Sequence, residues 1–112
     1  MKIAFTSSGT NWDSMIDSRF GRTEFIVMYD EEKQVISAVD NSKVKNVAHG
    51  AGSATAQMVF ELDPGVLITG NGPGETASNA LKHHHMRIFV DAHDMTLKQA
   101  YEQYKNGKLK EV

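Results

Sequence analysis

The feature that most constrains the fold is a helical pattern between two short apolar segments in the second half of the chain. Residues 66–69 and 87–90 each have the length and apolar character of a buried strand. Between them, the spacing of three and four residues predicts a helix with one face formed by Ala77, Ala80, Leu81 and His84. Two strands joined by a helix pair in parallel through a right-handed crossover. The chain is therefore expected to contain a parallel sheet with helices packed on it.

The first half of the chain has a different pattern, which is typical of antiparallel strands. Residues 3–6, 25–29 and 35–39 are short apolar runs and predict three strands. The turn over residues 30–33 is short, so the second and third strands are expected to form a hairpin. The hairpin makes the second strand run against its neighbours, and residues 40–46 predict a polar loop.

Two further helices flank the predicted strand–helix–strand unit. Residues 50–62 predict a helix that residues 63–65 end. Its apolar face is expected to carry Ala51, Ala54, Met58 and Leu62. Thr96 and Gln99 predict a capping box for the last helix, and Gly107 is suited to end it. The apolar stripe of that helix is expected to be Leu97, Ala100, Tyr101 and Tyr104.

Together these elements predict one α/β domain over residues 1–112. With 40% apolar and 23% charged residues, the chain has the composition of a globular domain. The element order βββαβαβα predicts a mixed five-stranded sheet, order 3-2-1-4-5, with strand 2 antiparallel and helices on its faces. This is the topology of ribonuclease-H-like folds. Such sheets bind ligands beyond the carboxyl ends of their parallel strands.

Those strand ends are expected to bring three distant segments to one crevice. Residues 7–9, 70–72 and 91–93 follow the three strands that share a direction. The loop that carries His49 leads into the first helix and is expected to reach the same rim. Because loop residues at such an edge carry function more often than core residues do, binding residues are expected here.

The composition excludes several functional classes. The chain has no cysteine, which excludes disulfides, thiolate catalysis and Cys-ligated zinc or iron–sulfur clusters. A formal net charge of −2 argues against nucleic acid or an anionic membrane as the partner. The apolar runs are too short to span a bilayer, and Lys2 leads directly into the first strand rather than into a leader segment. A cytoplasmic protein is expected, and its oligomeric state stays open.

Two glycine-rich segments adjoin predicted helix N-termini. Residues 70–74 lack the last glycine of a dinucleotide fingerprint and the Lys-Ser/Thr of a P-loop. They predict either a tight turn, with Pro73 in the first turn of the helix, or a nest of backbone N–H groups for an anion. At the preceding helix, Gly50 and Gly52 let a ligand approach the backbone. There His49 is either a ligand or a loop residue at the helix cap.

The segment Arg19-Phe20-Gly21-Arg22 precedes the second strand. Its two guanidinium groups flank an aromatic residue and are suited to an anionic ligand. Alternatively, Phe20 anchors the loop in the core, while the arginines are solvated or cap helix ends. The functional interpretation is favoured for Arg19 and the structural one for Arg22.

Without cysteine, the candidate metal ligands are histidine and methionine side chains. His49, His93 and Met95 are the candidates in the loops of the crevice. His83-His84-His85 is similar to a metal-binding tract, but consecutive residues on a helix point in different directions. His84 falls on the apolar stripe and His85 at the expected C-cap. A frayed, cationic helix end is therefore expected, and adventitious binding of nickel or zinc stays open.

The sequence offers little for catalysis. It has no nucleophile elbow, no Cys–His pair and no HExxH motif. Nucleases with a ribonuclease-H-like fold need clustered carboxylates, one of them on the first strand, and residues 2–6 contain none. The chain is therefore not expected to be an enzyme.

Six segments, in order along the chain, carry a family resemblance: residues 1–4 with the following Ser-rich loop, 17–22, 49–52, 70–74, 95–100 and 104–109. Together they resemble the dinitrogenase iron–molybdenum cofactor biosynthesis family, the NifX/NafY-like group that includes orange-protein-type relatives. The resemblance covers essentially the whole chain. Arginine rather than histidine at position 19 is closer to the orange-protein type. The tract at 83–85 departs from the family, which has small residues and a capping glycine there.

The resemblance implies a ribonuclease-H-like domain that binds or carries a preformed metal–sulfur cluster. The cluster is expected to be of the iron–molybdenum cofactor precursor type or the molybdenum–copper sulfide type, held without cysteine. Such clusters are anions whose sulfides accept hydrogen bonds. The expected cluster-binding residues are Ser7, Arg19, Phe20, His49, Gly50, Gly52, Asn71 and Gly72, and the expected metal contacts are His49, His93 and Met95.

Three functional hypotheses follow, in order of preference. The first is a non-enzymatic carrier that exchanges its cluster with a donor or acceptor protein. The second is a regulatory domain that binds a protein or a small anion at the same crevice without a cluster. The third is a metal-dependent hydrolase, which the missing carboxylate on the first strand opposes.

Overall fold

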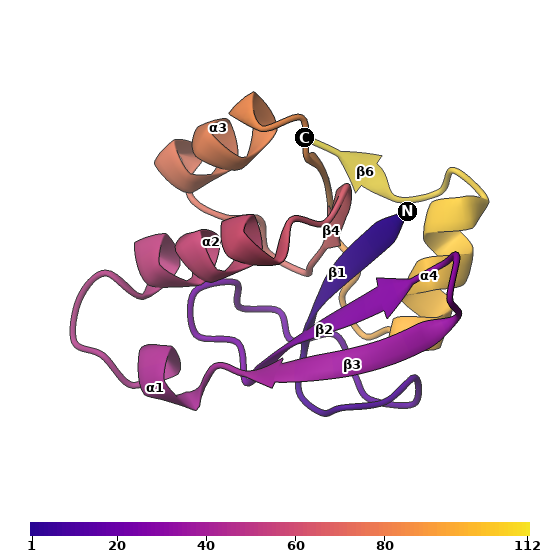
Figure 1. Ribbon diagram of the computed structural model, residues 1–112, viewed down its shortest axis with the longest axis horizontal. Helices are drawn as coiled ribbons and strands as arrows, with labels where there is room; N and C mark the ends of the chain where they lie inside the picture. The colour runs from indigo at the N-terminus through magenta and orange to yellow at the C-terminus, as the bar shows by residue number, and fades with distance from the viewer.

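A mixed six-stranded sheet forms the centre of the structure, a computed structural model that describes residues 1–112 except for the side chain of Lys45 (Figure 1). The strands are β1 (Lys2–Ser7), β2 (Phe25–Asp30), β3 (Val35–Asp40), β4 (Val66–Ile68), β5 (Arg87–Val90) and β6 (Lys110–Glu111). Their order is β3-β2-β1-β4-β5-β6. β1, β4 and β5 pair in parallel, whereas β2 runs antiparallel to β1 and β3. The predicted order, hairpin and crossover are confirmed for the first five strands.

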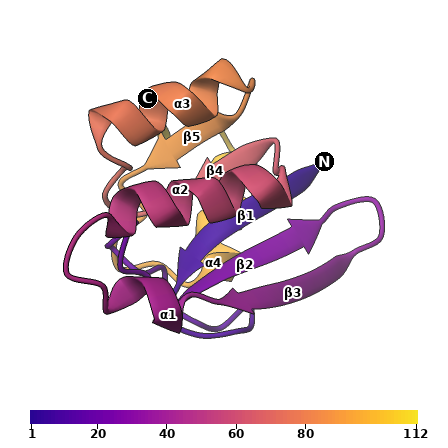
Figure 2. The same ribbon diagram turned by 60° about the vertical axis from the view of Figure 1, so that its left-hand side comes forward.

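Helices cover both faces of this sheet. They are α1 (Ser42–Lys45), α2 (Ala51–Leu62), α3 (Glu75–His83) and α4 (Leu97–Lys105). α2 and α3 lie side by side on one face, and α4 packs on the other (Figures 1 and 2). Among the residues that the structure describes, no helix is both long and apolar enough to cross a membrane.

Each face of the sheet has its own hydrophobic core, because successive strand residues point to opposite faces. On β1, Ala4 faces α2 and α3, whereas Ile3 and Phe5 face α4. On β4, Leu67 faces α2 and α3, and its neighbours Val66 and Ile68 face α4. Burying a side chain of this size contributes about 1.5–3 kcal/mol. The central strands, whose ends carry the candidate site, are thus packed from both sides.

Two elements were not predicted from the sequence. β6 pairs antiparallel with β5 and consists of two exposed charged residues, so no apolar pattern marks it. The Arg87 Nη2 atom lies 2.8 Å from the Glu111 Oε1 atom, and this ion pair joins β5 to β6. α1 lies within residues 40–46, which were predicted as a loop, and it has only four residues.

The predicted faces and ends of two helices need correction. In α2, Ala54 is exposed; Val59 packs in the core against the sheet, and Thr55 is buried against the Gly21 turn. In α3, Leu81 is buried as predicted, but Ala80 and His84 are exposed. α2 carries apolar side chains on more than one side, so spacing alone did not identify its contact face.

The segments that flank α3 also differ from the prediction. Pro73 lies before the N-cap Gly74 and is not in the first turn of the helix. The C-cap is His84, and His85 follows it with a left-handed φ of 65°. In α4, by contrast, the Thr96–Gln99 capping box and the buried Leu97 are confirmed.

Candidate functional site at the carboxyl edge

β1, β4 and β5 end at one edge of the sheet, and α2 and α3 begin at that edge (Figure 2). We call it the carboxyl edge; residues 8–24, 69–74 and 91–96 form its loops. The Asp91 N–H donates to the Gly70 carbonyl at 2.8 Å, and the Asn71 N–H donates to the Ser18 carbonyl at 2.7 Å. The predicted meeting of the strand ends is confirmed, with the segment around Ser18 lying against them.

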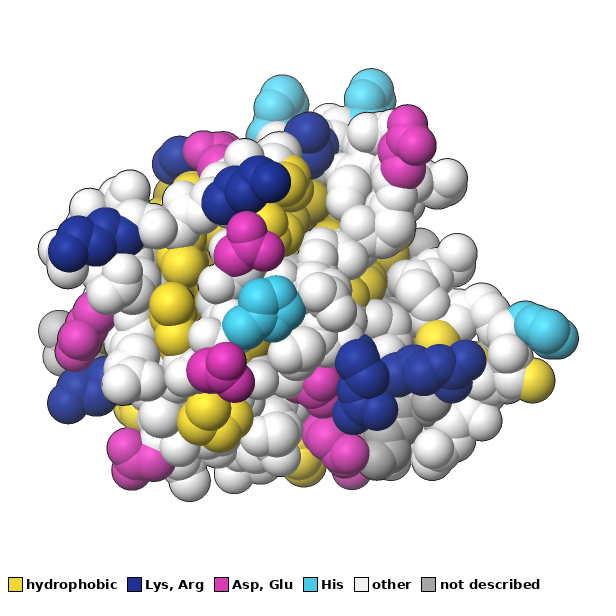
Figure 3. All heavy atoms as spheres, turned by 180° about the vertical axis from the view of Figure 1, so that it is seen from behind, with side chains coloured by type: hydrophobic (Ala, Val, Ile, Leu, Met, Phe, Trp, Pro, Cys, Tyr) yellow, Lys and Arg dark blue, Asp and Glu magenta, His cyan; other side chains and the backbone are white. Residues whose placement is uncertain are grey.

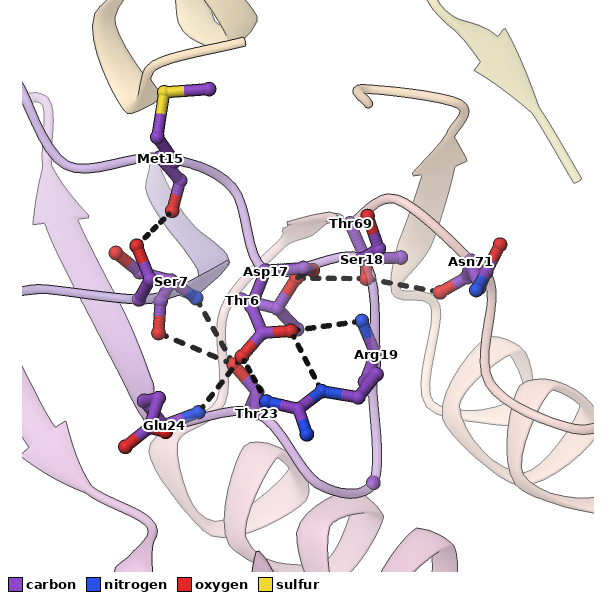
Figure 4. Close-up of polar contacts among 12 residues, drawn as sticks. Thr6, Ser7, Met15, Asp17, Ser18, Arg19, Thr23, Glu24, Thr69 and Asn71 are labelled. Carbon is purple, nitrogen blue, oxygen red and sulfur yellow. Dashed lines mark hydrogen bonds and ion pairs between the residues drawn. The ribbon is translucent and has the colours of Figure 1, made fainter. Parts of the chain in front are cut away.

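Two buried threonines join β1 to β4 beneath these loops. The Thr6 Oγ1 atom lies 2.8 Å from both Thr69 Oγ1 and the Asp17 carbonyl oxygen (Figure 4). Thr69 Oγ1 donates to the Asn71 carbonyl at 3.0 Å. Both side chains are fully buried, so the bonds form where water does not compete. The loops that follow β1 and β4 are therefore attached to the sheet by side chains as well as by the backbone.

The carboxylate of Asp17 organises the loop that carries the arginines (Figure 4). It accepts hydrogen bonds from the backbone N–H groups of Arg19 at 3.0 Å and Glu24 at 3.1 Å. It also accepts from Nε and Nη2 of Arg19 at 3.2 and 3.3 Å. Hydrogen bonding and charge attraction to this carboxylate raise the pKa of Arg19. Arg19 is thus a fixed cation whose side chain is 57% exposed, whereas that of Asp17 is 7% exposed.

The next turn docks directly on the start of α2. Phe20 is buried in the core under α2, as its structural interpretation predicted. A Cβ atom at Gly21 would lie 2.8 Å from the Gly52 nitrogen, so only glycine allows this approach. The Thr55 hydroxyl donates to the Gly21 carbonyl at 2.8 Å. Arg22 Nη1 donates to the Val47 carbonyl at 2.8 Å and ties the loop before α2 to this turn.

The N-termini of α2 and α3 differ from that of α4, which follows the third loop of the carboxyl edge. α2 begins at Gly50, which has a φ of 79°, and α3 begins at Gly74; neither has a side-chain cap. α4 begins at Thr96, whose side chain accepts from the Gln99 N–H while the Gln99 side chain bonds back. First-turn N–H groups have no partner within their own helix and carry partial positive charge. α2 and α3 therefore offer backbone donors at the edge where the loops converge.

His93, in the loop that follows β5, lies against the loops that follow β1 and β4. Its Nδ1 atom is 3.1 Å from the Ser18 hydroxyl, and its Nε2 atom is 3.9 Å from a carboxylate oxygen of Asp91. A Cβ atom at Gly70 would lie 2.9 Å from His93 Nδ1, so this glycine makes room for the ring. The His93 side chain is 40% exposed, so the ring is partly accessible to solvent.

The other predicted site residues differ in accessibility. His49, Asn71 and Gly72 are exposed, and His49 directly precedes the cap of α2. Ser7 is fully buried, and its hydroxyl donates to the Gly9 carbonyl at 2.8 Å. Met95 is partly buried against the core under α4. The predicted residues with open side chains are thus Arg19, His49, Asn71 and His93.

Sequence reasoning missed the polar residues that hold the loops in place. Asp17 and Ser18 lie in a segment that carries only the family resemblance, although an Asp side chain often accepts from the backbone N–H two residues further on. Asn41 was assigned to a polar loop, yet it is fully buried and donates to the Thr23 carbonyl at 3.0 Å. Such long-range contacts have no sequence pattern.

The edge offers charges and hydrogen-bond donors rather than a chelating group. Within the described part of the chain, no group of three or more His, Asp or Glu side chains is placed to hold a metal ion. Figure 3 shows a short row of basic side chains next to acidic ones, with separate histidines projecting from the same face. The charges and hydrogen-bond donors of the carboxyl edge would hold a bound anion. A metal in that anion would contact at most single histidines.

Comparisons with known proteins agree with the fold and identify the family. The family model for "dinitrogenase iron-molybdenum cofactor" matches residues 1–107. The apo form of the orange protein from Desulfovibrio gigas superposes with a TM-score of 0.91 and 32% sequence identity, covering 99% of this chain and 92% of that one. A NifB-type protein of the DUF35 family from Thermotoga superposes with a TM-score of 0.78 and 27% identity, covering 98% and 91%. No functionally curated protein matches the chain.

Proposed function

Because the chain belongs to the dinitrogenase iron–molybdenum cofactor family, we propose that it binds and carries a preformed anionic metal–sulfur cluster at the carboxyl edge. The cargo is of the iron–molybdenum cofactor precursor type or the molybdenum–copper sulfide type. The protein acts in the cytoplasm as a carrier, without catalysing a reaction. It receives the cluster from a donor protein or passes it to an acceptor protein.

The observation that carries this proposal is the unequal capping of the helices. α4 uses its own Thr96 and Gln99 side chains as caps, whereas α2 and α3 begin at glycines without a side-chain cap. A sulfide-bearing cluster is an anion with several acceptor atoms. Two helix N-termini at one edge supply several N–H donors and a favourable field for such an anion.

Basic side chains add to this field. Asp17 accepts two of the five N–H donors of Arg19, so the exposed guanidinium keeps donors for a ligand. His49 and His93 flank the edge from two loops, and each supplies one imidazole nitrogen to a metal or to a sulfide. The Gly50 and Gly72 N–H groups and the side-chain amide of Asn71 complete the contacts that we propose, whereas the Gly52 nitrogen faces the Gly21 turn.

The buried members of the predicted set have an indirect role in this proposal. Phe20 anchors the arginine loop in the core, and Ser7 stabilises the turn at the end of β1. Met95 reaches a metal only as a single soft ligand at the margin of the edge. The protein therefore holds its cargo mainly by hydrogen bonds, which suits a cluster that must be released intact.

The experiment is anaerobic reconstitution followed by desalting. The protein is offered iron with sulfide and, separately, tetrathiomolybdate with copper, and retained metal and visible absorption are measured. His49→Ala is compared with His83→Ala, because both histidines are exposed but only His49 adjoins the carboxyl edge. We expect stoichiometric retention by the wild type and His83→Ala and a clear loss by His49→Ala. If the desalted protein retains no metal from either mixture, the carrier proposal is refuted.

A second candidate function is a regulatory domain that binds a simple anion or a protein at the same edge. It is favoured by the lack, within the described residues, of a group of side chains that chelates a metal. Titration with molybdate or phosphate distinguishes the two functions. Saturable binding of an oxyanion, together with no retention of any metal–sulfide species, would support this second function over the first.

A further inference from the structure

β3 is an outer strand whose free edge is open to another strand. It pairs with β2 only, and Figure 2 shows no element beyond it. The Asn41 N–H donates to the Glu24 carbonyl, and the Glu31 N–H donates to the Met1 carbonyl. With the β2–β3 register, these bonds place the backbone groups of Val35, Ser37 and Val39 toward β2.

The intervening residues therefore direct their backbone groups away from the sheet. Ile36 and Ala38 present their N–H and C=O groups at the free edge, because hydrogen-bonding direction alternates along an antiparallel strand. Natural sheets usually protect such an edge with lysine, proline or a bulge. Residues 35–39 contain none of these, and the Val35 side chain is 53% exposed. This edge has the properties of a surface that pairs with another strand.

We propose that β3 pairs antiparallel with β3 of a second copy, around a twofold axis at Ser37. In this register Ile36 of each copy lies opposite Ala38 of the other, and the two share backbone hydrogen bonds. Val35 lies opposite Val39 on the α2 side of the sheet, and Ser37 lies opposite itself. Apolar residues then meet apolar residues on both faces of the joined sheet, which is the favourable cross-strand pairing.

Charge also selects this register. At each end of the paired strands, Gln34 of one copy lies opposite Asp40 of the other, so no like charges meet across the pair. A shift of two residues in one direction would set Glu32 against Asp40, two like charges. A shift in the other direction would set Ile36 against Asp40 and remove the Val35–Val39 contact. The Ser37-centred pairing is therefore the complementary one.

The pairing joins the two sheets and leaves both carboxyl edges open. Because the two copies of β3 run antiparallel, the two edges point in opposite directions. One short strand pair buries less than the roughly 1,200–2,000 Å² of a standard stable interface, so the dimer is expected to be weak and concentration-dependent. The inference does not depend on the cargo proposed above, because no residue of that site takes part.

The absence of cysteine makes a direct test possible. In the proposed register the two copies of residue 37 form a non-hydrogen-bonded pair, with Cα atoms about 4.5 Å apart, within the range for a disulfide. Ser37→Cys is compared with Ala38→Cys, whose thiols would lie two residues out of register and beyond that range. Both positions are exposed, so both variants are expected to fold. With oxidised glutathione as the oxidant, we expect S37C to form disulfide dimers at least tenfold faster than A38C.

Sedimentation equilibrium of the wild type and Val35→Lys complements the crosslinking. Val35 is exposed in the single copy, so the lysine leaves folding intact but places a charge in the interface. We expect concentration-dependent dimers of the wild type and a dissociation constant at least tenfold higher for Val35→Lys. Equal crosslinking rates, faster crosslinking by A38C, or a wild type that stays monomeric at about 1 mM would each overturn the proposal. The proposal would also be overturned if this edge paired only with a different protein and not with a second copy.

Discussion

Gly21→Ala tests whether the arginine loop is docked on α2 as the structure describes. The new Cβ atom would lie 2.8 Å from the Gly52 nitrogen, 2.9 Å from the Gly52 Cα and 3.1 Å from the Ala51 carbonyl carbon. All three are backbone atoms, which cannot rotate away as a side chain does. The turn or the first residues of α2 must therefore move.

The expected loss of stability follows from two effects. Overpacking of this kind costs about 1–3 kcal/mol. Movement of the turn also weakens the hydrogen bond from the Thr55 hydroxyl to the Gly21 carbonyl, which contributes about 1 kcal/mol. We expect Gly21→Ala to lower the free energy of unfolding by about 2–4 kcal/mol, a large fraction of a typical domain's stability.

The assay is urea unfolding followed by circular dichroism, with Gly52→Ala as the matched control. A Cβ atom at Gly52 would meet nothing within 4 Å, and alanine is the better helix former. Gly52→Ala is therefore expected to raise stability by about 0.5–1 kcal/mol. A Gly21→Ala protein as stable as the wild type would refute the reasoning, because it would mean that the loop does not contact α2.

Three further substitutions test other parts of the structure. Asp17→Asn removes the charge that orients Arg19, and we expect a loss of about 1.5–3 kcal/mol in urea unfolding; an unchanged midpoint would contradict this. Burial and the hydrogen bond to Glu31 raise the pKa of Tyr101, so its contribution to stability is present below the unfolded pKa of about 10 and is lost as pH rises further. Tyr101→Phe should therefore flatten the fall in melting temperature above about pH 10; an unaltered pH profile would argue against this. Thr96→Ala removes the cap of α4 and should lower the free energy of unfolding by about 1 kcal/mol in thermal unfolding. If Thr96→Ala is as stable as the wild type, this prediction is wrong.

The sequence predicted the elements whose pattern is local. The hairpin of β2 and β3, the crossover through α3 and the capping box at Thr96 each depend on residues close together in the chain. β6 was missed because Lys110 and Glu111 have no apolar pattern and are held by pairing with β5. The contact face of α2 was misassigned at Ala54 because the Gly21 turn and the sheet together determine the rotation of the helix.

The candidate site was predicted only in outline. The meeting of the strand ends follows from topology, so Gly70 and His93 could be placed at one edge from the sequence. The contacts that shape the edge join residues far apart, as in the bond between Asn71 and Ser18. The burial of Ser7 likewise depends on the loop that folds over it, which spacing along the chain does not reveal.

The central claim is that the uncapped starts of α2 and α3 bind an anionic metal–sulfur species. The most direct test is an anaerobic titration of isotope-labelled protein with tetrathiomolybdate, followed by the backbone amide shifts in NMR spectra. The account predicts saturable shifts concentrated at residues 49–53 and 70–77, with the amides of α4 unchanged. Shifts spread along α4 or β3, or no saturable shift at the starts of α2 and α3, would contradict it.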